Sequence, residues 1–220
     1  IVPILYLLSV LLSDISNYDI SMWGVGVANV SITSKKIVKN DLELKKIIYK
    51  SSSKSLANFI YPVSNYYETI INQNNILKFK KYINQKDYKQ KIDTYRKNDT
   101  TFYKNDQFIC NNCHNIFSLL DLAKENPRKA INDNFVIDRD GELFNASFKL
   151  VSKKDSIIVL ELNIDLNKNQ EYMPRKYDIF LWGIFLPNCK RLIWIDTDNN
   201  KIIKCKFVSQ FATLEANLIK

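Results

Sequence analysis

The single histidine of the chain belongs to the segment Cys110-Asn111-Asn112-Cys113-His114, whose residue types and spacing could support redox or metal chemistry. A c-type haem is attached to both cysteines of a C-x-x-C-H motif and uses the histidine as an axial ligand; Met173 would then be the sixth ligand. A thioredoxin-type redox pair would instead use Cys110 as the nucleophile and Cys113 as the resolving thiol, because a following helix N-terminus lowers the pKa of a cysteine.

Two further interpretations of this motif stay open. The phenylalanines that flank it are typical of a zinc knuckle, but Cys189 and Cys205 are too remote to supply a matching second pair of ligands. The other interpretation is a chance C-x-x-C spacing at the start of a helix. We therefore expect no metal or cofactor unless one of the first three interpretations holds.

Acid–base chemistry has one weak candidate group in this sequence. The carboxylates Glu161, Asp165 and Asp178 could form a catalytic pair, although solvated charges at strand ends are the simpler interpretation. The sequence contains none of the glycine-rich phosphate-binding motifs, no G-x-S-x-G and no H-E-x-x-H. With one histidine and four glycines, most nucleotide-binding and hydrolytic sites are excluded.

Composition describes a globular chain with a basic surface. The 220 residues are 46% hydrophobic and 25% charged, and the net charge is +9. The positive charge comes mostly from lysines spread along polar segments, which favours a solvated surface and no nucleic acid partner. Four cysteines are too few for a disulfide scaffold in a chain of this length, which favours a reducing compartment.

The first hundred residues predict an extension rich in helix and lysine. Residues 1–13 are apolar but short for a membrane span, so they fit a signal-peptide core, a membrane-surface anchor or a docked segment. Alternation between Val25 and Ile32 predicts a strand, and Asp41 is expected to cap a helix over 42–49. The serine-rich stretch 51–55 is a linker candidate. Apolar residues at helical spacing predict one or two surface helices within 65–97.

Residues 101–220 predict an α+β core domain, separate from the extension formed by 1–100. A helix is expected over 113–125, ended by Pro127. The terminal segment 211–220 is predicted as a short helix. Strands are predicted at Phe135–Ile137, Leu143–Val151, Ile157–Ile164 and Lys201–Val208, the second and third forming a hairpin. The whole predicts a mixed sheet of about four to five strands with helices on one face.

Four collinear segments of the second half resemble the NuoC family, known in mitochondria as NADH dehydrogenase subunit nine. The last of them starts at Gly183-Ile184-Phe185 and ends at Thr197-Asp198, and it is similar to the family sequence G-I-F-F-x-N-H-P-D-L-R-R-I-L-T-D. The other three segments are Asn115–Leu122 followed by Pro127, Glu142–Ser152, and Ile157–Asp165.

The resemblance implies a structural, cofactor-free subunit in the peripheral arm of respiratory NADH:ubiquinone oxidoreductase. Its partners would be other subunits of that complex, with membrane contact through residues 1–13 as a further expectation. Its place would be the matrix side of the mitochondrial inner membrane. The residues expected at subunit contacts are Arg175, Asp178, Gly183, Arg191 and Asp198. The thiol–disulfide oxidoreductase and the c-type cytochrome remain alternatives, and both would place the protein in the bacterial periplasm.

Overall fold

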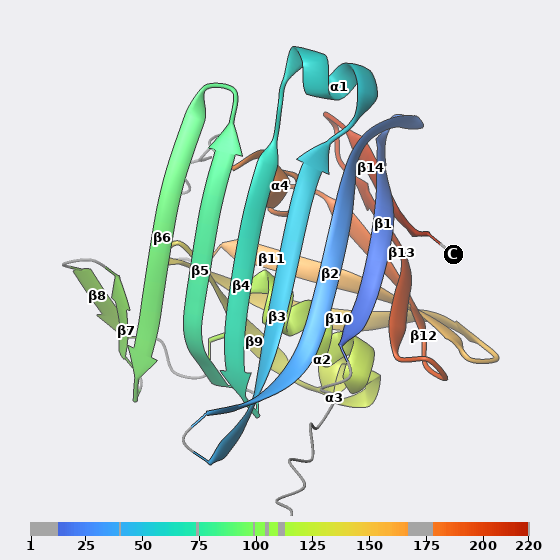
Figure 1. Ribbon diagram of the computed structural model, residues 1–220. Helices are drawn as coiled ribbons and strands as arrows, with labels where there is room; N and C mark the ends of the chain where they lie inside the picture. The colour runs from blue at the N-terminus through green and yellow to red at the C-terminus, as the bar shows by residue number, and fades with distance from the viewer. Residues whose placement is uncertain are drawn as a thin grey trace, which may run out of the picture.

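The computed structural model describes residues 13–39, 41–73, 75–98, 100–103, 106–109, 113–166 and 178–219. These residues form one antiparallel sheet of 14 strands, in the order β8-β7-β6-β5-β4-β3-β2-β1-β14-β13-β12-β11-β10-β9 (Figure 1). The strands of the first half are β1 Asp14–Met22, β2 Val25–Lys39, β3 Leu42–Ser53, β4 Ser64–Asn72, β5 Asn75–Gln85, β6 Tyr88–Lys97, β7 Thr100–Tyr103 and β8 Asp106–Ile109. The strands of the second half are β9 Asn134–Arg139, β10 Glu142–Lys154, β11 Ile157–Leu166, β12 Lys190–Asp196, β13 Lys201–Val208 and β14 Thr213–Leu218. Four short helices accompany them: α1 Ser55–Ile60, α2 Ile116–Glu125, α3 Pro127–Asn132 and α4 Ile179–Ile184.

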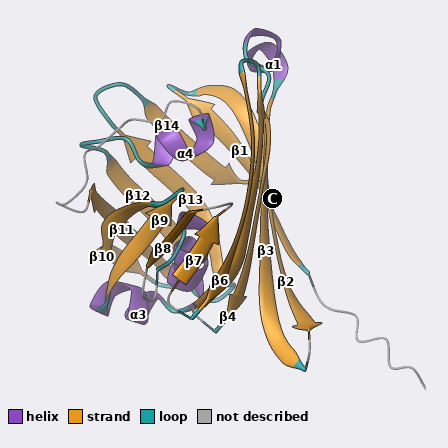
Figure 2. Cartoon of the chain, turned by 90° about the vertical axis from the view of Figure 1, so that its left-hand side faces the viewer, coloured by secondary structure: helices purple, strands orange, loops and turns teal. Residues whose placement is uncertain are grey.

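The sheet curls so that its two halves face each other. β1 and β14 pair at its centre; from there β2–β8 continue to one edge and β13–β9 to the other. Figure 2 shows the first half edge-on as one wall, with the second half opposite and helices α2 and α4 on the inner side. The two edges approach each other, because Cys113 and Asp138 line one small pocket together with residues of β5, β6 and β7.

The interior is filled around Phe117 on α2. Its ring lies 4.5 Å from the ring of Tyr49, 4.8 Å from that of Tyr67 and 6.2 Å from that of Phe79, centroid to centroid. Phe180 of α4 stacks on the same ring at 6.4 Å. Three strands and two helices therefore meet at one aromatic side chain, which couples the two halves of the sheet through a common core.

The surface helices predicted within 65–97 are wrong, because this segment forms β4, β5 and β6. Lysines occur on both faces of these strands. The apolar–polar alternation that normally identifies a strand is therefore hard to recognise in the sequence. Tyr67 and Thr69 are buried inward, but Glu68 is also buried, on the outer face. The segment is rich in the β-branched and aromatic residues that favour strands. Because polar residues are buried on both faces of the sheet, the apolar–polar alternation of a strand is not visible in the sequence.

Two other predicted helices are also strands. Asp41 does not cap a helix; it is a turn residue with φ +61° between β2 and β3. Residues 213–218 form β14, because they pair with both β1 and β13. The serine-rich stretch 51–55 completes β3 and begins α1. Long-range pairing overrides weak local preferences in each segment.

Several elements of the second half are confirmed. Asn115 caps the predicted helix, which begins at Ile116, and its side chain accepts a hydrogen bond from the Ser118 backbone. The predicted hairpin forms between β10 and β11, and β13 spans Lys201–Val208 as expected. The predicted strand from Val25 lies within β2. The mixed sheet of four to five strands is wrong, since the sheet is antiparallel and has 14 strands.

Candidate functional site

The Cys-His segment lies at the edge of the sheet, beside β9. Cys113 is buried and forms a disulfide bond, whereas Cys189 and Cys205 are free. Cys110 lies outside the described residues. Cys113 does not itself start a helix, because the backbone first extends along β9 through a bridge between His114 and Ile137.

His114 is a packed side chain in this structure. Its ring is 5% exposed, contacts the Ser118 hydroxyl at 3.2 Å through Nδ1 and meets the Phe135 ring edge-on at 5.5 Å. Burial lowers the pKa of His114 to about 4, and the nearby Lys129 adds to this effect. The imidazole is therefore neutral at pH 7. Met173, the expected sixth haem ligand, lies outside the described residues.

The residues expected at subunit contacts occupy unrelated places. Asp178 is buried and caps α4, accepting a hydrogen bond from the Leu181 backbone at 3.1 Å. Gly183 lies inside α4, where a Cβ atom would come within 2.9 Å of Leu214 Cδ1. Asp198 is exposed in the turn between β12 and β13. Arg175 lies outside the described residues.

Arg191 is buried and holds the loop between α4 and β12. Its guanidinium donates hydrogen bonds to the carbonyl oxygens of Ile184 at 2.6 Å, Leu186 at 2.6 Å and Cys189 at 2.9 Å. A planar guanidinium suits three acceptors that lie around it in different directions. The described contacts of this side chain are thus internal to the fold.

The three candidate carboxylates do not converge. Glu161 lies opposite Lys149 in the sheet, and Asp165 lies opposite Asn145. Neither residue is buried, whereas Asp178 is enclosed in the interior. Two of the three groups therefore belong to the surface of β11, and no paired acid and base results.

Sequence reasoning missed a charged cluster in the interior, centred on Lys81 of β5. This side chain is 0% exposed and its ammonium contacts Asp140, in the turn between β9 and β10. It also lies 3.5 Å from Oδ2 of Asp178, whose Oδ1 accepts a hydrogen bond of 2.7 Å from Tyr67. Burial raises the pKa of Asp178, while Lys81 opposes this shift. The cluster connects both halves of the sheet; its one sequence signal was the adjacent pair Lys80-Lys81, which puts a lysine on each face of β5.

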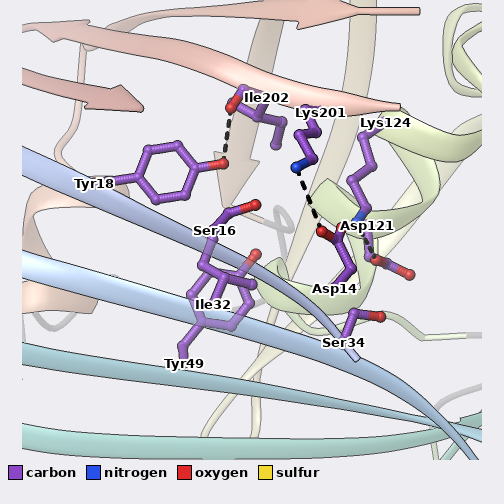
Figure 3. A pocket seen from close by; sticks show the side chains of 10 residues that line it. All are labelled: Asp14, Ser16, Tyr18, Ile32, Ser34, Tyr49, Asp121, Lys124, Lys201 and Ile202. Atoms are coloured by element: carbon purple, nitrogen blue, oxygen red, sulfur yellow. Dashed lines mark hydrogen bonds and ion pairs between the residues drawn. The ribbon is translucent and has the colours of Figure 1, made fainter. Parts of the chain in front are cut away.

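A second chain of charges closes the interior beside α2. Lys201 lies 3.6 Å from Asp14, and Lys124 lies 3.7 Å from Asp14 and 3.4 Å from Asp121. Figure 3 shows these groups around a pocket of about 20 Å³, where the Tyr18 hydroxyl donates to the Ile202 carbonyl at 2.7 Å. So small a space holds at most a water molecule.

On the other side of Asp121 lies a larger cleft, of about 350 Å³, between α2, α3 and the ends of β3 and β4. Lys45 reaches into it and binds Asp121 at 2.5 Å and also Glu125. His114 and Lys129 complete its lining. Because Lys45 holds both carboxylates, the cleft offers few free charges with which to select a ligand.

The opposite end of the sheet exposes apolar side chains, which we call the apolar end. Phe59 of α1 is 89% exposed, Trp23 is 65% exposed and Phe211 is 64% exposed. The full apolar end consists of Trp23, Val25, Leu56, Phe59, Ile60 and Phe211. The sequence signal was the apolar run from Leu56 to Ile60 directly after the serine-rich stretch.

Backbone hydrogen bonds place the three segments of the apolar end side by side. The Lys54 N–H, at the start of α1, donates to the Val27 carbonyl of β2 at 3.0 Å. The Trp23 N–H donates to the Thr213 carbonyl at 2.9 Å, which joins the β1–β2 turn to the β13–β14 turn. α1 stands above this end of the sheet in Figure 1. Six exposed apolar side chains therefore lie on neighbouring segments, the β1–β2 connection, helix α1 and the β13–β14 turn, unlike scattered exposed leucines.

Two further searches cover the described part of the chain. It contains no cluster of three or more His, Cys, Asp or Glu side chains that could hold a metal ion. None of its helices has the length and hydropathy to span a bilayer.

The comparison with known proteins corrects the expected identity. No family profile and no curated protein matches the chain. A solved structure that is similar is the β-barrel-like protein of the domain of unknown function DUF1849 from Brucella abortus. It has a TM-score of 0.56 and 7% sequence identity, over 96% of this chain and 97% of that chain. At this identity the likeness shows the fold alone.

That fold overturns the NuoC resemblance and what it implied. A 14-stranded antiparallel sheet is not the small mixed sheet that the resemblance required, and nothing supports a subunit of respiratory complex I or a mitochondrial role. The thioredoxin-like and cytochrome alternatives fall with the same finding. The chain shares its fold with a β-barrel-like protein of the domain of unknown function DUF1849.

Proposed function

We propose that this protein binds a lipid surface through its apolar end. The observation that carries the proposal is the exposure of Trp23, Phe59 and Phe211 on two turns and the neighbouring helix α1. Aromatic side chains favour the boundary between water and hydrocarbon, because their rings are apolar and the indole N–H can still reach water. Membrane contact was expected at residues 1–13, of which 1–12 lie outside the described residues; the apolar end is a different surface.

Charge supports a lipid surface over a neutral apolar partner. The chain carries a net charge of +9, and the exposed Lys86 lies beside α1, where it donates to the Ile60 carbonyl; Lys54, at the start of α1, is paired with Asp19 at 2.5 Å. Lysines near a bilayer are attracted by anionic headgroups, and each contributes on the order of 1 kcal/mol close to the surface. The aromatic side chains would then enter the interface while Lys86 meets the headgroup phosphates.

The disulfide bond of Cys113 bears on the compartment. Disulfides persist in oxidising surroundings and are reduced in the cytosol. We therefore place the protein outside the cytosol, in a compartment such as the bacterial periplasm. This assignment opposes the reducing compartment that the cysteine count alone favoured.

Vesicle binding tests the proposal. Wild-type protein should sediment with vesicles of phosphatidylcholine and phosphatidylglycerol, and Trp fluorescence should shift to shorter wavelength. The double variant Leu56→Ser/Phe59→Ser should lower the partition coefficient by on the order of a hundredfold, because burying each side chain contributes roughly 1.5–3 kcal/mol.

A matched control exists at a distant hairpin. Leu150→Ser/Val151→Ser removes two exposed apolar side chains from β10, where Leu150 is 43% and Val151 is 48% exposed. This control should bind vesicles like the wild type. If both double variants bind equally, or if the wild type fails to sediment, the proposal is wrong.

A further inference from the structure

The outer face of β3–β6 concentrates positive charge, independently of the apolar end. Strand alternation places seven lysines and only two carboxylates there, an excess of five positive charges. The charged residues of this outer lysine face are Lys46, Lys50, Lys78, Lys80, Lys89, Lys91, Lys97, Glu68 and Asp93. No helix or strand of the described chain covers it (Figure 2).

The two carboxylates are already neutralised by lysines of the same face. Glu68 lies 2.6 Å from Lys46 and 3.9 Å from Lys80, and Asp93 lies 3.3 Å from Lys78. Four lysines have no carboxylate within 4 Å among the described residues: Lys50, Lys89, Lys91 and Lys97. The excess charge therefore sits on exposed side chains that are ready for an anionic partner.

The outer face of the second half of the sheet distributes its lysines and carboxylates differently. On the outer face of β10–β14, Lys149 lies across from Glu161 in the ladder. Lys204 and Lys206 both bind Glu215, at 2.9 and 2.8 Å. The acids of this second face therefore lie beside Lys149, Lys204 and Lys206, whereas Lys50, Lys89, Lys91 and Lys97 of the first half have no such neighbour among the described residues.

Aromatic rings form a track between the free lysines. Register places Lys50, Tyr66, Tyr82 and Lys91 in one row across β3, β4, β5 and β6. The rings of Tyr66 and Tyr82 lie 5.6 Å apart, and the Lys91 ammonium lies 5.5 Å from the centroid of the Tyr82 ring. Because neighbouring strands are about 4.8 Å apart, the row extends roughly 14 Å.

We propose that this outer lysine face binds an acidic polysaccharide that runs across the strands. The C–H faces of sugar rings would pack on Tyr66 and Tyr82, and their acidic groups would meet Lys50 and Lys91 at the ends of the row. The disulfide bond of Cys113 favours an oxidising compartment outside the cytosol, where acidic glycans occur. A lipid bilayer fits this face less well, because it lacks the cluster of exposed apolar side chains found at the apolar end.

Binding to polygalacturonate tests the inference, with neutral dextran, a single-stranded oligonucleotide and phosphatidylglycerol vesicles as the other probes. The wild type should bind polygalacturonate more tightly than dextran or the oligonucleotide, whereas vesicle binding reports on the apolar end. The triple variant Lys50→Gln/Lys89→Gln/Lys91→Gln should weaken polygalacturonate binding by at least about tenfold and flatten its salt dependence, since fewer counterions are released. Tyr82→Ser should weaken it while leaving the salt dependence unchanged.

The control is Lys149→Gln/Lys153→Gln/Lys154→Gln, which removes the same charge from the exposed hairpin of β10 and β11. It should retain wild-type affinity within about threefold, because net charge alone contributes little at physiological salt. Equal weakening of polygalacturonate binding by both triple variants would overturn the inference, as would tighter binding to dextran or to the oligonucleotide. Vesicle binding by the variant Lys50→Gln/Lys89→Gln/Lys91→Gln tests the apolar end separately. The failure of one proposal therefore does not affect the test of the other.

Discussion

The hydroxyl group of Tyr67 donates a hydrogen bond of 2.7 Å to Oδ1 of Asp178, which lies 111 residues further along the chain. Tyr67 belongs to β4 in the first half of the sheet, and Asp178 caps α4 in the second half. With Lys81, they connect the two facing walls at a point where both partners are buried. Removal of either partner exposes a polar group to an environment that cannot hydrate it.

Tyr67→Phe should lower the free energy of unfolding by about 1–3 kcal/mol, because Asp178 loses a hydrogen bond while the aromatic ring stays packed. Urea denaturation followed by circular dichroism measures this change. Tyr82→Phe, on the outer face, is the matched control and should change stability by less than about 0.5 kcal/mol. Equal losses in the two variants would show that the Tyr67 bond does not contribute.

Lys81→Met should be more destabilising, by about 3–5 kcal/mol, because Asp140 and Asp178 are left buried without their cation. Adding Asp178→Asn to this variant should recover part of the loss, since the second change removes a buried charge. Lys80→Met, one residue away on the outer face, should cost less than about 1 kcal/mol, as expected for a part-exposed ion pair. Thermal unfolding of the four proteins at pH 7 distinguishes these outcomes, and equal effects of Lys80 and Lys81 would contradict them.

Asp138 and His114 should contribute to the pH dependence of stability with opposite signs. The carboxyl group of Asp138 is enclosed although the residue as a whole is part-exposed, and desolvation raises the pKa of Asp138 to about 7. The folded protein then binds this proton first, so Asp138 favours folding as the pH falls from about 7 towards 4. The pKa of His114 is lowered to about 4, so the unfolded chain binds that proton first and acidification below about 6.5 opposes folding.

Single substitutions should separate these two opposing contributions. Asp138→Asn should make stability fall more steeply between pH 7 and pH 4, because the contribution of Asp138 that opposes the His114 effect is removed. His114→Gln should produce the reverse, a shallower fall or a gain over the same range. Urea midpoints recorded from pH 4 to pH 8 measure both slopes. Parallel profiles for the two variants and the wild type would refute the assignment.

Arg191→Lys should cost about 2–4 kcal/mol despite keeping the charge, because one ammonium cannot serve the carbonyl oxygens of Ile184, Leu186 and Cys189 together. The loop between α4 and β12 should also exchange its amide hydrogens faster. Arg128→Lys, at an exposed position of α3, should leave stability and exchange unchanged. A stable Arg191→Lys variant with unchanged exchange would show that the loop is held by other contacts.

Local signals predicted several regular elements of the second half, although not the strand β14. The helix expected over 113–125 forms as α2, capped by Asn115, and Pro127 ends it and starts α3. Asp140 and Gly141, both with positive φ, form the turn between β9 and β10, and the predicted hairpin forms between β10 and β11. These features depend on a few neighbouring residues, so no knowledge of distant contacts was needed.

The secondary structure of the first half was predicted wrongly for a physical reason that β4 and β5 illustrate. In β5, Lys81 points inward to two carboxylates while Lys80 points outward, so charge does not mark a face. In β4, Glu68 is buried beneath outer lysines and Thr69 is buried against α2. With polar residues on both sides, the period-two alternation is lost, and apolar spacing imitates a helix.

By itself the sequence determined composition, excess positive charge, caps, turns and the positions of several strands, because each depends on nearby residues. The tertiary structure decided which strands pair, that β14 joins β1 and β13, and that Lys81 reaches Asp140 and Asp178. It also decided the surfaces: lysines distant in sequence align on one face, and Trp23, Phe59 and Phe211 meet at one end. Such neighbours are set by long-range pairing across the sheet, which no local window of sequence contains.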